Sequence, residues 1–400
     1  MRSSSVAITG LGCLCAPGNN LGECMVSLFK GDREPAPPLR FTSSHSGSYP
    51  VFEVPDDLAS LNHKGISDIS LTARLALAAA HEAVGDAGLD REWLRSKRVG
   101  ICMGTTVGSA MNNEAFYRQY CRDEEPDMAP ITRFLHSNPA SVLAREFDLT
   151  GPCQTVVNAC SSGTDAVGLG AFWIQSGLCD IVLAGGADEL CHVTYNGFIS
   201  LMITDDLPCK PFDRERKGLN LGEGAAVLVL ESEECRRNRK KQARAFVLGY
   251  GASCDAYHLT APHPQGKGLR RAIEEAMELS GSAASDLAFI NAHGTGTKDN
   301  DRVEAQVLND LFPGIPFLST KGYTGHTLGA AGAIEAAFTV ACLEEGRVPK
   351  NAGFATPDPD LPASPVQSGM AVKETVALSE SLAFGGHNAV LVIGIERGLL

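Results

Sequence analysis

The stretch Gly222-Glu223-Gly224-Ala225-Ala226-Val227-Leu228-Val229-Leu230 is echoed by Gly385-Gly386-His387-Asn388-Ala389-Val390-Leu391-Val392-Ile393. The tetrapeptide that begins at Ala226 recurs identically at Ala389, an offset of 389 − 226 = 163 residues. Each copy is a glycine turn followed by an apolar run that predicts a buried strand, and each copy closes one half of the chain. We infer an internal duplication, with one half at residues 1–235 and the other at residues 236–400.

Apolar runs typical of strands alternate with helical patterns through both halves, which predicts an α/β fold in layers. The expected strands are Val6–Gly10, Val99–Met103, Thr155–Asn158, Ile181–Gly185, Ala225–Glu231, Phe246–Gly249, Ala288–Asn291, Phe317–Ser319, Val376–Ser379 and Ala389–Ile393. The expected helices are Leu71–Ala87, Gly163–Ser176, Leu269–Ser280, Arg302–Leu311 and Ala330–Glu345. The strand centres are nearly all apolar, so we expect helices on both faces of the sheet.

Composition excludes several classes of function. The net charge of −13 argues against nucleic acid as a partner. No apolar stretch approaches the ~20 residues that cross a bilayer, and the N-terminus enters a strand without a signal-type sequence, so we expect a cytoplasmic protein. The 13 cysteines include no Cys-x-x-Cys pair. We expect most of them to be small buried apolar residues, with no disulfide framework and no metal site.

Cys160 lies in Val156-Val157-Asn158-Ala159-Cys160-Ser161-Ser162-Gly163-Thr164, where an apolar run meets small residues that can start a helix. A helix N-terminus offers free N–H groups and a partial positive charge, and both favour thiolate over thiol. The sequence therefore predicts a nucleophile that is acylated near neutral pH. Two distant histidine motifs, Asn291–Thr297 and Lys321–His326, could supply its partners.

Residues 155–164 resemble the active-site elbow of the β-ketoacyl-acyl-carrier-protein synthases of types I and II, condensing enzymes of fatty acid and polyketide synthesis in the thiolase-like superfamily. Matching motifs occur in the family's order along nearly the whole chain, at residues 8–12, 184–189, 210–213, 222–225, 291–297, 321–335 and 384–388. The resemblance implies two similar βαβαβαββ halves that form a five-layered α-β-α-β-α thiolase-like core. Such proteins are usually dimers.

The resemblance also implies roles for the matching residues. Cys160 would take an acyl group from the phosphopantetheine of an acyl carrier protein. His293 and His326 would then promote decarboxylation of a bound malonyl thioester, and the resulting carbanion would lengthen the acyl chain by two carbons. Imidazole suits this step because it can donate a hydrogen bond or move a proton near pH 7. Lys321 matches a lysine that polarises the site, with Glu304 as its expected partner.

Four further positions match residues that contact the substrate, namely Thr295, Thr297, Phe384 and Val107. The two threonine hydroxyls would bind the amide groups of pantetheine, with helix capping as the alternative. Phe384 matches a gate beside the acyl pocket, and its N–H would join that of Cys160 in an oxyanion hole. Val107 falls where relatives place a residue that limits the acyl pocket. No bound cofactor is expected, because the phosphopantetheine arrives on the carrier protein.

The chain departs from the family's pattern in two segments. Leu382-Ala383-Phe384 precede the paired glycines, where many relatives have Phe-Gly or Gly-Phe-Gly, and this departure bears on loop movement and acyl preference. The segment Ile203–Cys209 contains Asp205 and Asp206, although basic residues near there often help to dock the acidic carrier. Docking could instead use Lys64, Lys210 or the basic run from Arg236 to Arg244, and that run also fits a solvated helix end.

Several alternatives stay open at this point. The protein could serve housekeeping fatty acid synthesis as a homodimer, or a specialised polyketide or polyene pathway as a heterodimer with a non-condensing homologue. A catalytically silent subunit of the chain-length-factor type is the other class, although those relatives commonly carry glutamine in place of the cysteine. A thiolase would need a second catalytic cysteine late in the chain, whereas Cys342 falls in the middle of a predicted helix.

Overall fold

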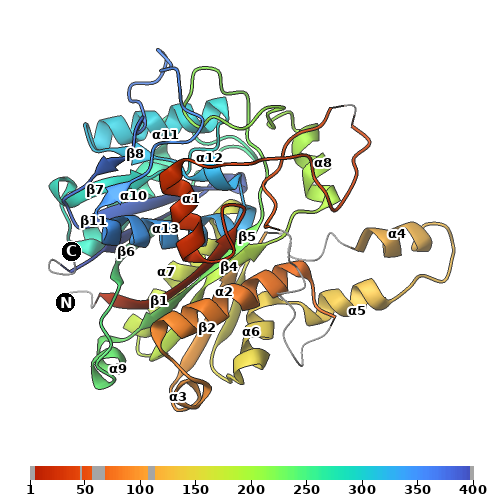
Figure 1. Ribbon diagram of the computed structural model, residues 1–400, viewed down its shortest axis with the longest axis horizontal. Coiled ribbons are helices and arrows are strands. Elements are labelled where there is room, and N and C mark those ends of the chain that lie inside the picture. Colours follow the sequence, from red (N-terminus) through yellow and green to blue (C-terminus); the bar gives the residue numbers. More distant parts are fainter. Residues whose placement is uncertain (1–4, 46, 56–67, 107–112, 397–400) are drawn as a thin grey trace.

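The computed structural model describes residues 5–45, 47–55, 68–106 and 113–396 (Figure 1). One sheet has the order β3-β2-β4-β5-β1-β6-β12-β11-β7-β8. Its first five strands in chain order are β1 (Val6–Cys15), β2 (Val99–Gly104), β3 (Cys153–Val156), β4 (Ile181–Asp188) and β5 (Gly224–Glu231). The others are β6 (Ala245–Cys254), β7 (Leu287–Asn291), β8 (Phe317–Leu318), β11 (Val376–Leu382) and β12 (His387–Gly394).

The duplication inferred from the sequence is visible in this strand order. The second half of the sheet repeats the first in reverse, with β6, β12, β11, β7 and β8 in the places of β1, β5, β4, β2 and β3. The repeated tetrapeptide lies in β5 and β12, which are equivalent strands. The two halves join where β1 and β6 pair in antiparallel fashion, from Val6 opposite Val247 to Ile8 opposite Ala245.

Helices form three layers around the strands. In the first half α2 (Leu71–Ala87) and α6 (Pro139–Phe147) pack with one face of β2, β4 and β5. In the second half α10 (Lys267–Ser280) and α11 (Lys298–Leu311) pack with β7, β11 and β12. Between the halves lie α7 (Ser162–Gln175) and α13 (Ala331–Glu345), which contact each other and strands of both halves. The five-layered thiolase-like architecture expected from the resemblance is confirmed.

Long, strongly periodic segments were predicted closely, and short ones were not. The helix at Leu71–Ala87 has the predicted bounds. Strand β3 begins and ends two residues earlier than predicted, because the chain turns at Ala159, whose φ is 49°. The unpredicted helices are α6, whose bounds are given above, and α1 (Leu21–Lys30), α3 (Arg91–Arg95), α4 (Glu114–Tyr120), α5 (Ala129–His136), α8 (His192–Ser200), α9 (Glu233–Asn238) and α12 (Lys321–Thr324). The proposed division after residue 235 falls within α9, and it stays a prediction.

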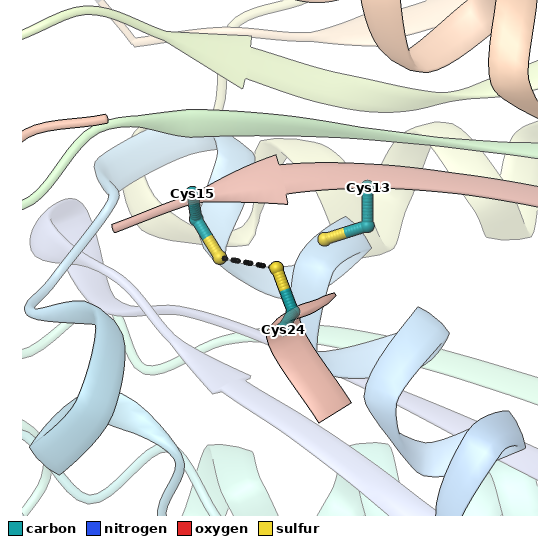
Figure 2. A group of neighbouring side chains, drawn as sticks. All are labelled: Cys13, Cys15 and Cys24. Carbon is teal, nitrogen blue, oxygen red and sulfur yellow. Dashed lines mark hydrogen bonds between the residues drawn. The ribbon is translucent and has the colours of Figure 1, made fainter. Parts of the chain in front are cut away.

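Three cysteines meet under α1, an arrangement that the sequence analysis did not anticipate. Cys13 and Cys15 lie two residues apart on β1, so their side chains share one face, and Cys24 of α1 faces them (Figure 2). Their sulfur atoms lie within 4.8 Å of one another, with 3.7 Å between Cys15 and Cys24. Burial raises the pKa of Cys13 and of Cys15, whereas hydrogen bonds from these two cysteines lower the pKa of Cys24. Among the described helices, none has the length and apolarity that a membrane span requires.

Candidate active site

A pocket of about 310 Å³ collects most of the residues singled out in the sequence. Its lining includes Cys160, His293, Thr295, Thr297, His326 and Phe384. These residues come from turns that follow β3, β7, α12 and β11, so both halves of the chain contribute. Phe198 and Met202 also line the pocket, and the sequence analysis missed them. Val107 lies outside the described residues.

Cys160 occupies a tight turn between a strand and a helix. The 3₁₀ turn η2 (Ala159–Ser161) leads directly into α7, and Ala159 before the cysteine has a left-handed φ of 49°. The turn is held by a hydrogen bond from the Asn158 N–H to Ser162 Oγ at 2.8 Å. A second one runs from Ser161 Oγ to Asp165 Oδ2 at 2.9 Å. Cys160 is 5% exposed, so the turn holds the thiol at the floor of the pocket.

The acidity of this thiol differs from the sequence-based expectation. Burial raises the pKa of Cys160 to about 12, while the Lys321 charge and a hydrogen bond from the Phe384 N–H act in the opposite direction. A helix N-terminus alone predicts a lowered pKa, but the cost of desolvating a thiolate here outweighs it. Cys160 is therefore a thiol in this structure. The Phe384 N–H already points at the sulfur, as an oxyanion-hole donor would.

The two histidines form a pair of neutral N–H donors. Their rings are almost perpendicular, at 83°, with centroids 5.2 Å apart. Nδ1 of His293 lies 3.1 Å from Lys321 Nζ, and Nδ1 of His326 accepts the Leu328 N–H at 3.3 Å. Burial, aided by the Lys321 charge, lowers the pKa of both imidazoles well below its usual value. Because each Nδ1 accepts a hydrogen bond, each ring carries its proton on Nε2.

Lys321 has a different partner from the one expected. Its ammonium group contacts the Glu335 carboxylate and His293 Nδ1, and not Glu304. Burial raises the pKa of Glu335 to about 7, opposed by Lys321. The sequence held a signal for this residue, since Glu335 is the single charged residue among positions 331–343 of an otherwise apolar helix. A buried charge in such a helix requires a partner of opposite charge.

Glu304 instead holds the backbone that carries His293. Its Oε1 accepts the His293 N–H at 2.5 Å, and its Oε2 accepts the Gly294 N–H at 2.7 Å. Asn300 Nδ2 donates to the same Oε2 at 3.2 Å. Gly294 has a φ of 36°, and this bend turns the loop back over α11. Glu304 therefore supports the site by holding the His293 backbone, and not by pairing with Lys321.

Thr295, Thr297 and Phe384 lie at the pocket wall. Thr295 Oγ1 and Thr297 Oγ1 are 2.8 Å apart. Thr297 precedes α11 but makes no side-chain capping bond, so helix capping does not occupy its hydroxyl. The Phe384 ring stacks on Phe198, with centroids 5.6 Å apart and planes 14° from parallel. Gly385 has a φ of 85°, which glycine adopts without strain, and the backbone therefore turns directly after Phe384.

The basic residues at the pocket are exposed, whereas two arginines of the charged run after Ser232 form ion pairs within the molecule. Lys217 and Lys298 line the pocket and are exposed. Within the run, Arg239 bonds Glu231 and Arg244 bonds both Asp86 and Glu344, which leaves these two guanidinium groups paired inside the molecule. In the acidic segment Asp205 is buried, with its carboxylate accepting the Leu207 N–H at 3.0 Å. Lys64 lies outside the described residues.

Comparison with known proteins agrees with this geometry. The family description "Beta-ketoacyl synthase, N-terminal domain" matches residues 3–235, and the corresponding C-terminal domain matches residues 244–355. The 3-oxoacyl-[acyl-carrier-protein] synthase 2 of Staphylococcus aureus (strain COL) is 32% identical over 415 residues, which covers 98% of each chain.

Two solved structures extend the comparison. The ishigamide ketosynthase/chain length factor is 33% identical with a TM-score of 0.93, covering 98% of this chain and 100% of that one. A type II polyketide ketosynthase, solved with its acyl-carrier protein and a bound hexaketide, is 26% identical with a TM-score of 0.89, covering 99% and 100%. The chain belongs to the β-ketoacyl synthase family and is a condensing enzyme of the acyltransferase class.

Proposed function

We propose that this chain is a 3-oxoacyl-[acyl-carrier-protein] synthase that condenses malonyl-carrier protein with an acyl group held on Cys160. The observation that carries the proposal is the pair of neutral imidazoles, each with Nε2–H available, in one pocket with a buried thiol. Thiol and donors serve two successive steps, acyl transfer and decarboxylation. Each step needs only groups that the pocket already contains.

In the first step Cys160 Sγ attacks the thioester carbonyl of acyl-carrier protein. The carbonyl oxygen gains negative charge, which the N–H groups of Cys160 and Phe384 stabilise. The C–S bond to pantetheine breaks, and the proton lost by Cys160 ends on the departing pantetheine thiol. Because burial raises the Cys160 pKa, the thiol loses this proton during the attack and not beforehand.

In the second step malonyl-carrier protein occupies the same entrance. The malonyl thioester oxygen accepts hydrogen bonds from Nε2–H of His293 and of His326. As the bond to the carboxylate breaks and CO₂ leaves, the electron pair moves into an enolate whose oxygen these donors stabilise. The enolate carbon then attacks the acyl carbonyl on Cys160, and the thiolate is released. The product is a 3-oxoacyl-carrier protein that is two carbons longer.

The carrier is proposed to dock at the mouth of this pocket. Lys217 and Lys298 are exposed there and would face an acidic carrier surface. The hydroxyls of Thr295 and Thr297 also line the pocket and would bind the amides of the phosphopantetheine arm. No cofactor held by the enzyme itself enters this scheme. The related ketosynthase solved with its acyl-carrier protein supports a carrier as partner.

A dimer through the edge strand β3 is also proposed. This strand ends the sheet, and Cys153 and Gln154 on it are exposed. Val157 and Phe172 nearby are 60% and 61% exposed, which is high for large apolar side chains. An unpaired edge beside such residues invites pairing with another chain of the same fold. The likeness to a ketosynthase/chain length factor supports a heterodimer in a specialised pathway beside the homodimer. A cytoplasmic location is part of the same proposal.

The experiment that tests this function follows intact protein mass. The purified chain is incubated with a panel of acyl-carrier proteins and malonyl-carrier protein. We expect acylation at Cys160, followed by a 3-oxoacyl product two carbons longer. Acylation without extension would mean that a partner chain or another carrier is required. No acylation with any primer would favour the silent chain-length-factor-like subunit, which the presence of Cys160, His293 and His326 argues against.

A further inference from the structure

Glu380 is a fully buried carboxyl group in the strand that leads to the Phe384 gate. Successive side chains of a strand point to opposite faces of the sheet. Leu378 and Leu382, on the same face as Glu380, belong to the apolar cluster of α10 and α11. Ser381, on the other face, bonds Thr164 of α7 at 2.8 Å. Glu380 therefore points into the outer layer of the second half, toward α11.

The group that Glu380 meets there is Glu304. A hydrogen bond to Glu304 and the charge of that residue are the interactions that, after burial, raise the Glu380 pKa. As an ionised group Glu380 would have no partner, because no N–H or O–H donor in the described part of the chain reaches either of its oxygens. Glu304 in contrast accepts N–H groups from His293, Gly294 and Asn300. Burial raises the pKa of Glu304 to about 7 and that of Glu380 well above its usual value, so at and above neutral pH the negative charge belongs on Glu304, which has the donors, and the proton on Glu380.

We propose that Glu380 is a positioning residue that stays protonated and donates its O–H to the Glu304 carboxylate, which fixes the turn that carries His293. This proposal deepens the function proposed above and rests on it for its activity readout. It explains how a carboxyl with no other partner is accommodated between apolar strands and helices. In this arrangement one hydrogen bond connects β11, the strand that precedes Phe384, to the loop that carries His293.

Among the described residues around Glu380, the charged groups are engaged elsewhere and the other neighbours are apolar, so only a proton can neutralise its carboxylate. From α11, Asp301 also faces inward, but Arg216 and the Phe212 N–H engage it. The buried residues of α10 are Gly268, Leu269, Ala272, Ile273 and Ala276, and none of them is charged. On β12 the residue opposite Glu380 is Val390, and on β7 the inward residues are apolar. The Lys321 ammonium group acts on Glu304 and contacts Glu335.

Loss of this proton would act on decarboxylation in particular. Two adjacent carboxylates without a cation between them repel strongly in an apolar interior. Glu304 would then give up part of its hold on the His293 and Gly294 N–H groups, and the imidazole would leave its position. Acylation of Cys160 uses the N–H groups of Cys160 and Phe384 and would continue. We therefore expect an alkaline decline in malonyl decarboxylation that acyl transfer does not share.

The first test is spectroscopic and does not depend on activity. Infrared difference spectra are recorded between the wild-type protein and Glu380→Gln at neutral pH. We expect the wild type to show an additional C=O stretch of a protonated carboxylic acid, which shifts on deuteration. Glu345→Gln, an exposed position on α13, is the matched control and should remove no such band. A carboxylate band in place of the acid band would overturn the proposal, whatever the protein's activity.

The second test compares pH profiles of malonyl-carrier decarboxylation. Gln at 380 keeps an N–H donor for Glu304 but cannot ionise, so Glu380→Gln should retain activity at neutral pH and lose the alkaline decline of the wild type. Glu380→Leu, which keeps the volume without a donor, should lower kcat at all pH values with little change in KM. The Leu variant also provides the difference spectrum if the Gln variant does not fold. Identical alkaline limbs in wild type and Glu380→Gln would overturn the proposal.

Discussion

Lys321 Nζ lies 3.1 Å from Nδ1 of His293 and at the same time contacts the carboxylate of Glu335. This lysine therefore connects a helix of the central layer to a histidine that lines the pocket. Burial and this ammonium group together lower the pKa of His293 and keep it neutral, and the ammonium group also sets the ring's tautomer and offsets the buried charge of Glu335. The arrangement explains why a lysine and a glutamate are buried in an otherwise apolar region.

Glu335→Gln should reduce decarboxylation and change its dependence on pH. The raised pKa of Glu335, about 7, means that the carboxylate which pairs with Lys321 forms as pH rises through that value and is lost below it. The wild type should therefore show an acidic limb near neutrality that the variant lacks. Initial rates of CO₂ release from pH 5 to 9 provide the measurement. Glu345→Gln serves as control, and an unchanged acidic limb in Glu335→Gln would exclude this residue as its source.

The nucleophile can be separated from the decarboxylation machinery. Cys160→Ala should abolish acyl-enzyme formation in intact mass spectra, because no other thiol lines the pocket among the described residues. Cys160→Gln should also end condensation but keep or raise malonyl decarboxylation, since His293 and His326 remain. Persistent acylation of the Ala variant would assign the nucleophile to another residue.

Each histidine should affect decarboxylation more than acylation. Loss of one preorganised donor to a developing oxyanion costs on the order of 10²-fold in kcat. His293→Ala and His326→Ala should show losses of this order in CO₂ release while Cys160 is still acylated. Time courses of acyl-enzyme mass and of CO₂ release provide the two readouts. Condensation at nearly the wild-type rate in either variant would remove that histidine from the mechanism.

Thr297→Val should weaken the binding of carrier-borne substrates without slowing the chemical step. Valine keeps the shape of threonine but removes the hydroxyl that faces Thr295 and the pocket. One lost hydrogen bond of about 1 kcal/mol corresponds to a roughly fivefold rise in KM at unchanged kcat. The buried Thr339 of α13 offers a matched control, because its hydroxyl bonds the Glu335 carbonyl away from the pocket. A fall in kcat alone would argue against contact with pantetheine.

The edge strand β3 should control assembly. Val157→Asp places a charge on an exposed apolar residue directly after the strand, and it should disfavour burial against a second chain. We expect the variant to elute as a smaller species than the wild type in size-exclusion chromatography with light scattering. Leu259→Asp, on a loop of the second half and 80% exposed, is the control. A dimer that survives Val157→Asp would place the interface elsewhere.

The amino-acid sequence by itself determined the architecture. Apolar periodicity and the repeated Ala-Val-Leu-Val segment indicated two equivalent α/β halves, because such patterns are encoded in short windows of the chain. The order of the cysteine and histidine motifs indicated the family and the residues that line the pocket. Short helices such as α4 and α5 were missed, since they bury no residues that would mark an inward face.

Only the tertiary structure decided how the charges and protons are arranged. It paired Lys321 with Glu335 rather than Glu304, and it raised the Cys160 pKa where the helix N-terminus alone predicts a lowered one. It also brought Glu380 to Glu304, and Cys24 to two cysteines of β1. These outcomes depend on which distant side chains meet and on how completely water is excluded there. Neither property is present in a local sequence pattern, because both arise when the layers pack together.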